Sequence, residues 1–210
     1  MGNTGPESTV PPAGRADSGA GLRPAGAVGG QGRAIGVLVS GEGTNLQALI
    51  DAGLPICAVA SNRKEARALE RARAAGVATA TFSLDCHVTR EERDFVMATW
   101  LEEHRVELVV LAGYMHLLTR PFLDRFPGRI VNVHPSLLPS FPGLRPIDDA
   151  IAAGVDTTGV TVHLVDEGVD SGPVLRQEPV PVEPRETLVD RIHAVEHRLL
   201  PQVVRELCAR

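Results

Sequence analysis

Residues 130–143 read Ile-Val-Asn-Val-His-Pro-Ser-Leu-Leu-Pro-Ser-Phe-Pro-Gly, and the rest of the chain is best interpreted outward from this stretch. Its β-branched residues favour a buried strand. Asn132 and His134 are two positions apart, so a strand directs both side chains to one face. Pro135 ends the strand because it cannot donate a backbone hydrogen bond. A carboxamide and an imidazole are therefore expected together where a strand ends.

That position has chemical meaning, because ligands of open α/β sheets bind beyond the carboxyl ends of the strands. A carboxamide there can donate to a developing oxyanion. An imidazole can exchange a proton near neutral pH. A single strand histidine is more often structural than catalytic, so the pair by itself does not establish a site.

The composition is that of a soluble globular protein, with 43% hydrophobic and 22% charged residues among 210. A net charge of −5 with mixed signs and an aromatic content of 3% argue against nucleic acid as a partner. No apolar run reaches the ~20 residues of a membrane span. The three cysteines are far apart and suggest neither a disulfide framework nor a metal site, so a cytoplasmic location is expected.

Strand and helix patterns alternate along most of the chain, which predicts a doubly wound α/β fold with a mostly parallel, twisted sheet. Two later strands and a long last helix should add antiparallel edge strands and a C-terminal helix. Residues 1–33 are rich in Gly and Pro and are expected to be a disordered tail, leaving one domain over 34–210. Strands are predicted at 34–39, 55–60, 77–82, 108–112, 130–134, 160–165 and 174–182, and helices at 64–75, 89–105, 147–153 and 185–209.

The predicted helix over 89–105 begins with a capping-box pattern, because Thr89 is followed three residues later by Glu92. Phe95, Val96 and Leu101 are expected to form its buried face.

A glycine-rich turn, Ser-Gly-Glu-Gly-Thr-Asn-Leu at 40–46, lies between the first strand and the first helix. Such a turn can bind an anion through free backbone N–H groups and the helix dipole. Thr44 or Asn45 could equally be an ordinary N-cap, so the spacing leaves both interpretations open.

The stretch Val-Asp-Glu-Gly-Val-Asp-Ser-Gly-Pro at 165–173 forms an acidic turn between the two late strands. A solvated turn is the ordinary interpretation. Alternatively, one carboxylate reaches His134, orients the ring and favours its protonated form. His163, on the preceding strand, is expected to be structural.

Taken together, these segments resemble the folate-dependent glycinamide ribonucleotide formyltransferases of purine synthesis, over residues 34–208. The run Asn-Val-His-Pro-Ser-Leu-Leu-Pro at 132–139 is similar to the family's diagnostic motif. Asp170, in the context Asp-Ser-Gly-Pro, matches the family's aspartate. The resemblance implies that Asn132, His134 and Asp170 are catalytic.

The resemblance also assigns substrate contacts. It implies that the ribonucleotide is held by Gly43, Thr44, Asn45 and Glu196. It implies that formyl-folate is held by Arg90, Met115, His116, Leu117, Leu118, Asn132, Asp166, Glu167, Gly168, Val169 and Asp170. Two departures stand out: His116 occupies a position where the family has arginine, and residues 144–147 resemble the tRNA-directed formyltransferases instead.

The implied reaction transfers the formyl group of 10-formyltetrahydrofolate, as co-substrate, to the primary amine of glycinamide ribonucleotide, without a metal. Related alternatives are formyl transfer to methionyl-tRNA or to a nucleotide sugar, and hydrolysis of formyltetrahydrofolate. A tRNA enzyme would be expected to carry a further C-terminal domain and basic patches, and the hydrolase a further N-terminal domain. A non-enzymatic phosphate-binding module would not need Asn132, His134 and Asp170 together. The partners expected are small molecules, with a homodimer allowed, and Leu138–Pro139 is predicted to be a cis bond.

Overall fold

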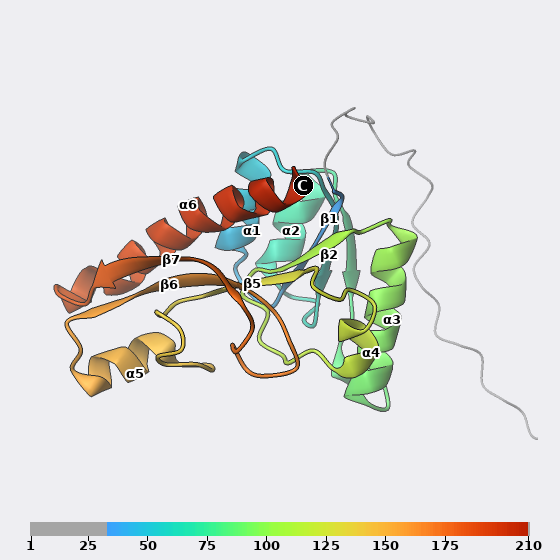
Figure 1. The fold of residues 1–210 in the computed structure, drawn as a ribbon. Coiled ribbons are helices and arrows are strands. Elements are labelled where there is room, and N and C mark those ends of the chain that lie inside the picture. Colours follow the sequence, from blue (N-terminus) through green and yellow to red (C-terminus); the bar gives the residue numbers. More distant parts are fainter. Residues whose placement is uncertain (1–32, 210) are drawn as a thin grey trace, which may run out of the picture. The chain divides into compact units, whose positions relative to one another are not determined.

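A computed structural model describes residues 33–209, whose centre is a seven-stranded sheet in the order β3-β2-β1-β4-β5-β6-β7 (Figure 1). The first five strands in this order are parallel to one another. β6 pairs antiparallel with β5, and β7 pairs antiparallel with β6. This confirms the predicted fold class. The strands are β1 Ile35–Val39, β2 Ile56–Ser61, β3 Ala78–Thr81, β4 Leu108–Leu111, β5 Ile130–His134, β6 Thr157–Leu164 and β7 Val174–Pro181.

Helices cover both faces of the sheet, and the side-chain alternation of the strands explains why. In β1, Val37 and Val39 belong to the apolar core under α1, α2 and α6, whereas Leu38 belongs to the core under α3 and α4. Each strand therefore needs apolar residues at successive positions. The helices are α1 Thr44–Asp51, α2 Arg67–Ala74, α3 Arg90–Glu103, α4 Arg120–Leu123, α5 Pro146–Ala153 and α6 Leu188–Cys208.

The strand order reverses between β1 and β4, which are neighbours in the sheet but distant in sequence. From β1 the chain proceeds outward to β2 and β3, and from β4 it proceeds the other way to β5. A crevice at the carboxyl ends of the strands is expected at such a switch point. The turns after β1, β2 and β4 meet there: the Met115 N–H donates to Ser40 Oγ at 2.9 Å, and Ser40 Oγ lies 2.6 Å from Asn62 Oδ1.

The antiparallel pairing of β5 with β6 sets the register opposite the key strand. Asn132 lies opposite His163, and His134 lies opposite Thr161. β7 then forms the sheet edge, as its prolines predicted. The Leu138–Pro139 bond is cis, which confirms the prediction.

Three expectations need correction or fall outside the described residues. The capping box is present, with the Glu92 N–H donating to Thr89 Oγ1 at 3.1 Å, but Phe95 and Val96 are 49% and 40% exposed. Leu101 is buried as expected, but its companions on the buried face of α3 are Arg93, Asp94, Met97 and Ala98. A paired Arg and Asp can be buried where an unpaired charge cannot. α4 was not predicted, and the final helix begins at Leu188 after a short 3-10 turn. The expected tail lies outside the described residues, apart from Arg33.

Within residues 33–209, no helix is both long enough and apolar enough to cross a membrane.

Candidate active site

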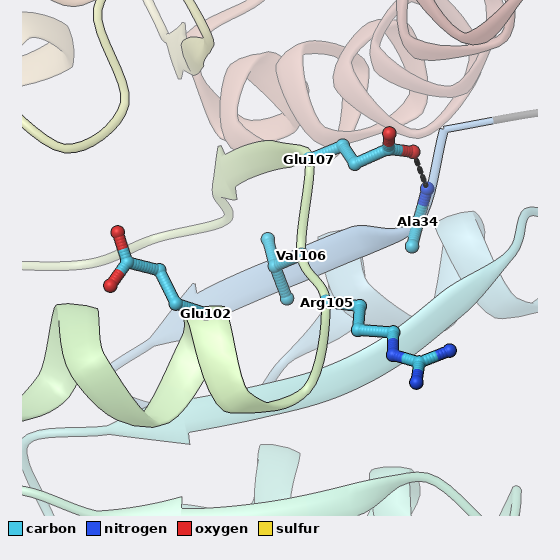
Figure 2. A pocket seen from close by; sticks show the side chains of 5 residues that line it. All are labelled: Ala34, Glu102, Arg105, Val106 and Glu107. Atoms are coloured by element: carbon cyan, nitrogen blue, oxygen red, sulfur yellow. Dashed lines mark hydrogen bonds between the residues drawn. The ribbon is translucent and has the colours of Figure 1, made fainter.

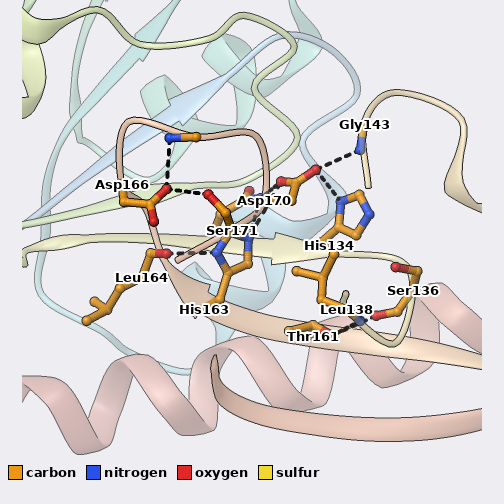
Figure 3. Close-up of polar contacts among 12 residues, drawn as sticks. His134, Ser136, Leu138, Gly143, Thr161, His163, Leu164, Asp166, Asp170 and Ser171 are labelled. Carbon is orange, nitrogen blue, oxygen red and sulfur yellow. Dashed lines mark hydrogen bonds and ion pairs between the residues drawn. The ribbon is translucent and has the colours of Figure 1, made fainter. Parts of the chain in front are cut away.

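The end of β5 brings a carboxamide, an imidazole and a carboxylate together. Figure 3 shows the imidazole of His134 beside the carboxylate of Asp170. Asn132 Nδ2 donates to Asp170 Oδ1 at 3.3 Å. His134 Nδ1 lies 3.4 Å from the other oxygen, Oδ2. These residues are separated by as many as 38 positions in sequence, so the fold itself assembles the cluster. The structure thus places the residues predicted as catalytic within contact of one another.

Asp170 is held in place by the backbone as well as by its neighbours. The Gly143 N–H donates to Asp170 Oδ2 at 2.8 Å. Burial alone raises the pKa of Asp170, but the His163 hydrogen bond, the Gly143 N–H and the charges of His134 and His163 bring this pKa below its ordinary value. Asp170 is therefore ionised at neutral pH. Its φ of 51° lies in the left-handed region, which Asp and Asn tolerate better than most residues.

Both ring nitrogens of His134 face oxygen atoms, and the side chain is only 4% exposed. Nδ1 faces Asp170, and Nε2 lies 2.8 Å from the Phe141 carbonyl oxygen. An imidazolium donates from both nitrogens, whereas a neutral ring can donate from only one. In this structure the Nε2 position is occupied by the Phe141 carbonyl oxygen, so a substrate oxygen would have to replace that carbonyl as the acceptor.

His163 is a member of the same cluster, which the sequence interpretation missed. Nδ1 donates to the Leu164 carbonyl at 2.8 Å, and Nε2 lies 3.1 Å from Asn132 Nδ2 and 3.6 Å from Asp170 Oδ1. The position of His163 follows from the β5–β6 register, which places it opposite Asn132. Its structural hydrogen bond is present as expected, yet the ring also borders the candidate site.

The glycine-rich turn before α1 is shaped by close packing. Gly43 has a φ of 74°, and a Cβ there would lie 2.5 Å from the Ala68 side chain. Gly43 is the N-cap of α1, and no side chain caps this helix. Neither Thr44 nor Asn45 acts as a cap, so the first-turn N–H groups keep their capacity to bind an anion.

Asn45 instead points toward the last helix, where its Nδ2 donates to Glu196 Oε2 at 3.2 Å. Glu196 is 5% exposed, and this burial raises its pKa, against the opposing effects of the Asn45 hydrogen bond and the His193 charge. Asn45 Oδ1 is buried and has no hydrogen-bond partner within residues 33–209. A buried carboxylate beside an unused carbonyl oxygen is suited to binding a group rich in N–H donors.

The residues assigned to folate by resemblance differ in their exposure and in their contacts. Met115, Leu117 and Val169 are apolar and between 47% and 56% exposed, so they present uncovered apolar surface. Leu118 instead packs partly against the core under α3 and α4. Glu167 forms an exposed ion pair with Arg120 at 2.6 Å.

The remaining folate assignments lie in the same two loops and at the start of α3. Asp166 Oδ1 accepts from the Gly168 N–H at 2.9 Å and from Ser171 Oγ at 2.8 Å, which shapes the acidic loop. Arg90 is exposed at the start of α3, and its charge is close enough to lower the pKa of His116.

Two hollows of the described surface differ in their position relative to the sheet. One, of about 750 Å³, is lined by residues following β1, β2 and β3, including Ser40, Gly41 and Asn62. It adjoins the glycine-rich turn at the carboxyl end of the sheet. The other, of about 500 Å³, is lined by residues that include Ala34 and Glu107, at the opposite end of β1 and β4 (Figure 2). The second hollow therefore lies away from the cluster at the end of β5.

Residues 33–209 contain no group of three or more His, Cys, Asp or Glu side chains arranged to hold a metal ion.

Comparison with known proteins identifies the family. Residues 33–204 match the family described as formyl transferase, which is most of the chain. The chain belongs to the formyl transferase family. The cluster at the end of β5 lies within the matched region.

Relatives in this family include single-activity and multi-activity proteins. The chain is 45% identical over 179 residues to phosphoribosylglycinamide formyltransferase of Mycobacterium tuberculosis (strain CDC 1551 / Oshkosh), covering 81% of this chain and 83% of that protein. It is 44% identical over 181 residues, 81% of its length, to trifunctional purine biosynthetic protein adenosine-3 of Drosophila pseudoobscura pseudoobscura, but spans only 13% of that protein. The solved glycinamide ribonucleotide transformylase 1 of Symbiobacterium toebii is 43% identical, with a TM-score of 0.82 and coverage of 90% and 92% of the two chains.

Proposed function

We propose that this formyltransferase is a phosphoribosylglycinamide formyltransferase, which transfers the formyl group of 10-formyltetrahydrofolate to the primary amine of glycinamide ribonucleotide. The observation that carries the proposal is the convergence of Asn132, His134 and Asp170 at the end of β5. Similarity to relatives of comparable length and of the same activity supports it.

The residues proposed to hold formyl-folate fit a flat, partly apolar molecule. Met115 and Leu117, on the loop after β4, are each more than half exposed. Val169 lies on the acidic turn at 165–173. A pterin ring that covers these side chains would remove apolar area from water, worth roughly 25 cal/mol per Å². Arg90 at the start of α3 adds a cation for an anionic tail.

The ribonucleotide is proposed to bind between α1 and α6. The uncapped N-terminus of α1, with Gly43 and Thr44, would hold the phosphate. Glu196 and the unused Asn45 Oδ1 would accept hydrogen bonds from the glycinamide end. With its phosphate held at one end and its glycinamide at the other, the ribonucleotide would be oriented with its amine toward β5.

Asn132 and His134 are proposed to stabilise the oxyanion that forms when the amine attacks the formyl carbon. His134 Nε2 faces the Phe141 carbonyl at 2.8 Å, and the oxyanion would replace this carbonyl as the acceptor of the Nε2 proton. One such donor is typically worth ~3 kcal/mol. Asn132 Nδ2 contacts both Asp170 and His163. Turning one of its hydrogens to the oxyanion costs the contact with His163, whose ring stays anchored to Leu164 O.

Asp170 is proposed to keep the His134 ring oriented and to balance its positive charge while protons move. The attacking nitrogen must lose a proton, and the folate nitrogen must gain one. His134 can carry this proton, directly or through water, because Asp170 stabilises the imidazolium. Holding both substrates in one crevice makes the attack effectively unimolecular.

The proposed cellular setting is the cytoplasm. Cys57, Cys86 and Cys208 are all free thiols, which is typical of proteins in reducing compartments.

A direct assay separates the proposal from its alternatives. The chain is incubated with 10-formyltetrahydrofolate alone, and then with glycinamide ribonucleotide, methionyl-tRNA or an amino sugar nucleotide. The proposal requires rapid formyl transfer with glycinamide ribonucleotide and slow turnover without an acceptor. Equal release of formate in the absence of any acceptor would instead show a hydrolase. Faster transfer to either other amine would show a different acceptor specificity.

A further inference from the structure

A second polar cluster joins the two proposed substrate sites at the switch point of the sheet. Its members come from four separate parts of the chain. Ser40 follows β1, Asn62 follows β2, Arg93 and Asp94 lie on α3, and His116 follows β4. All except His116 are at most 7% exposed, so these contacts lie largely away from bulk water.

The cluster holds the loop after β4 at three points. The Met115 N–H donates to Ser40 Oγ at 2.9 Å. The Thr119 N–H and hydroxyl both donate to Asp94 Oδ2, at 2.7 and 2.8 Å. Between them, His116 Nδ1 lies 2.7 Å from Arg93 Nη1, and Nε2 lies 3.1 Å from the side-chain nitrogen of Asn62, Nδ2. The His116 ring thus turns into the protein, and Met115 and Leu117 on either side of it are exposed.

The charge of the neighbours fixes the protonation state of this ring. Arg93 carries only N–H donors, so Nδ1 of His116 must accept and the neutral ring carries its proton on Nε2. The Asn62 amide then presents its oxygen to Nε2 and its nitrogen to Ser40 Oγ, because an amide nitrogen cannot accept. Burial lowers the pKa of His116, and the charges of Arg93, Arg90 and Arg63 lower it further against the weaker opposing effect of Asp94. His116 therefore remains an acceptor at neutral pH, and protonation would place a second cation beside a fully buried guanidinium.

We propose that His116 is a positioning residue, which as a neutral acceptor for Arg93 fixes the loop of residues 115–119 for formyl-folate and ties it to Ser40 beside the glycine-rich turn. The proposal rests on the proposed function. It assigns His116 a role through Arg93 and Asn62, instead of contact of its ring with the ligand. Loss of the acceptor should loosen the folate loop and leave the cluster at the end of β5 intact.

The test compares His116→Leu and His116→Asn with the unchanged chain. Leu removes the acceptor and leaves a buried Arg93 N–H unsatisfied, so the KM for formyl-folate should rise about 10-fold, with kcat within about 3-fold. Asn places an amide oxygen near the position of Nδ1 and should restore the KM to within about 3-fold. His104→Gln, at the far end of α3, is the matched control and should leave both constants unchanged.

A pH series tests the same inference without a disruptive change. As the pH falls from 8 through the ordinary histidine value of 6.5 and below, protonation of His116 should raise the KM for formyl-folate in the unchanged chain. Dividing this KM by that of His116→Asn cancels the other titrating groups, and the ratio should rise only at acidic pH. A constant ratio would overturn the inference, as would an unchanged KM in His116→Leu or an equal rise in the KM of both substrates. Absence of formyl transfer by the unchanged chain would instead refute the proposed function.

Discussion

Two polar clusters of this chain each combine a histidine with an aspartate, and they hold the imidazole in opposite ways. At the end of β5, His134 Nδ1 directly faces Asp170, at 3.4 Å. At the switch point, the guanidinium of Arg93 lies between His116 and Asp94, and contacts both. The two rings therefore differ in the charge of the group that touches them.

This difference decides what each histidine can do. A carboxylate beside a ring nitrogen stabilises a proton on that nitrogen, so His134 can hold and pass one. A guanidinium can only donate, so His116 must present a lone pair and stay neutral. Under the proposed function, similar residue types thus serve proton transfer in one place and fix the position of a loop in the other.

The largest expected effect comes from neutralising the carboxylate that touches His134. Asp170→Asn keeps a side chain that tolerates the left-handed backbone at this position. It removes the charge that stabilises the imidazolium, so kcat should fall at least about 100-fold. Dissociation constants of both substrates, measured by calorimetry, should change by less than about 5-fold.

Asp149→Asn, an exposed carboxylate-to-amide change on α5, is the matched control for Asp170→Asn and should keep full activity. An Asp170→Asn enzyme with normal kcat would remove the proposed difference between the two clusters.

The second effect concerns stability, and it tests the buried pair of the other cluster. Asp94→Ala leaves the fully buried Arg93 without its counter-charge, which should lower the free energy of unfolding by about 3–5 kcal/mol. Glu102 lies on the same helix as Asp94, and Glu102→Ala breaks its partly exposed pair with Arg125, which follows α4. This change should cost about 1 kcal/mol or less. Urea unfolding at pH 7 measures the loss of unfolding free energy in both variants. A loss in Asp94→Ala as small as that in Glu102→Ala would show that Arg93 needs no anion.

A smaller effect is expected at the ribonucleotide site, which neither histidine touches. Glu196→Gln keeps an oxygen for Asn45 but loses the charge, so the KM for glycinamide ribonucleotide should rise about 10-fold. The KM for formyl-folate should be unchanged. In the unchanged chain, acidification should weaken ribonucleotide binding as Glu196 is protonated, at a higher pH than for an ordinary carboxyl because its pKa is raised. A rise in both KM values would argue against a local role.

The smallest expected effect is the contribution of Asp170 to stability at low pH. Because the pKa of Asp170 lies below its ordinary value, its ionised form stabilises the folded chain. This stabilisation is fully present above the ordinary value of 3.8 and is lost as the pH falls through the lowered pKa. The difference in unfolding free energy between the unchanged chain and Asp170→Asn should therefore shrink in this range. A difference that is constant with pH would contradict the pKa shift.

The sequence predicted the parts of the molecule that local pattern controls. Strand–helix alternation and the Asn132/His134 spacing follow from side-chain periodicity, and both were visible without coordinates. Non-local pairing was not visible. The place of His163 depends on the β5–β6 register, and the burial of Arg93 depends on Asp94 and His116 meeting it from α3 and the loop after β4. Phe95 and Val96 were wrongly placed in the core because a buried ion pair occupies the inner face of α3.

The central claim is that His134 and Asp170 act as one unit in formyl transfer, and a double-mutant cycle tests it most directly. The kcat for formyl transfer to glycinamide ribonucleotide is measured for His134→Gln, Asp170→Asn and the double variant. If Asp170 acts through the His134 ring, the double variant should be about as slow as the slower single variant. Losses that multiply would show that the two residues act independently and would contradict the account.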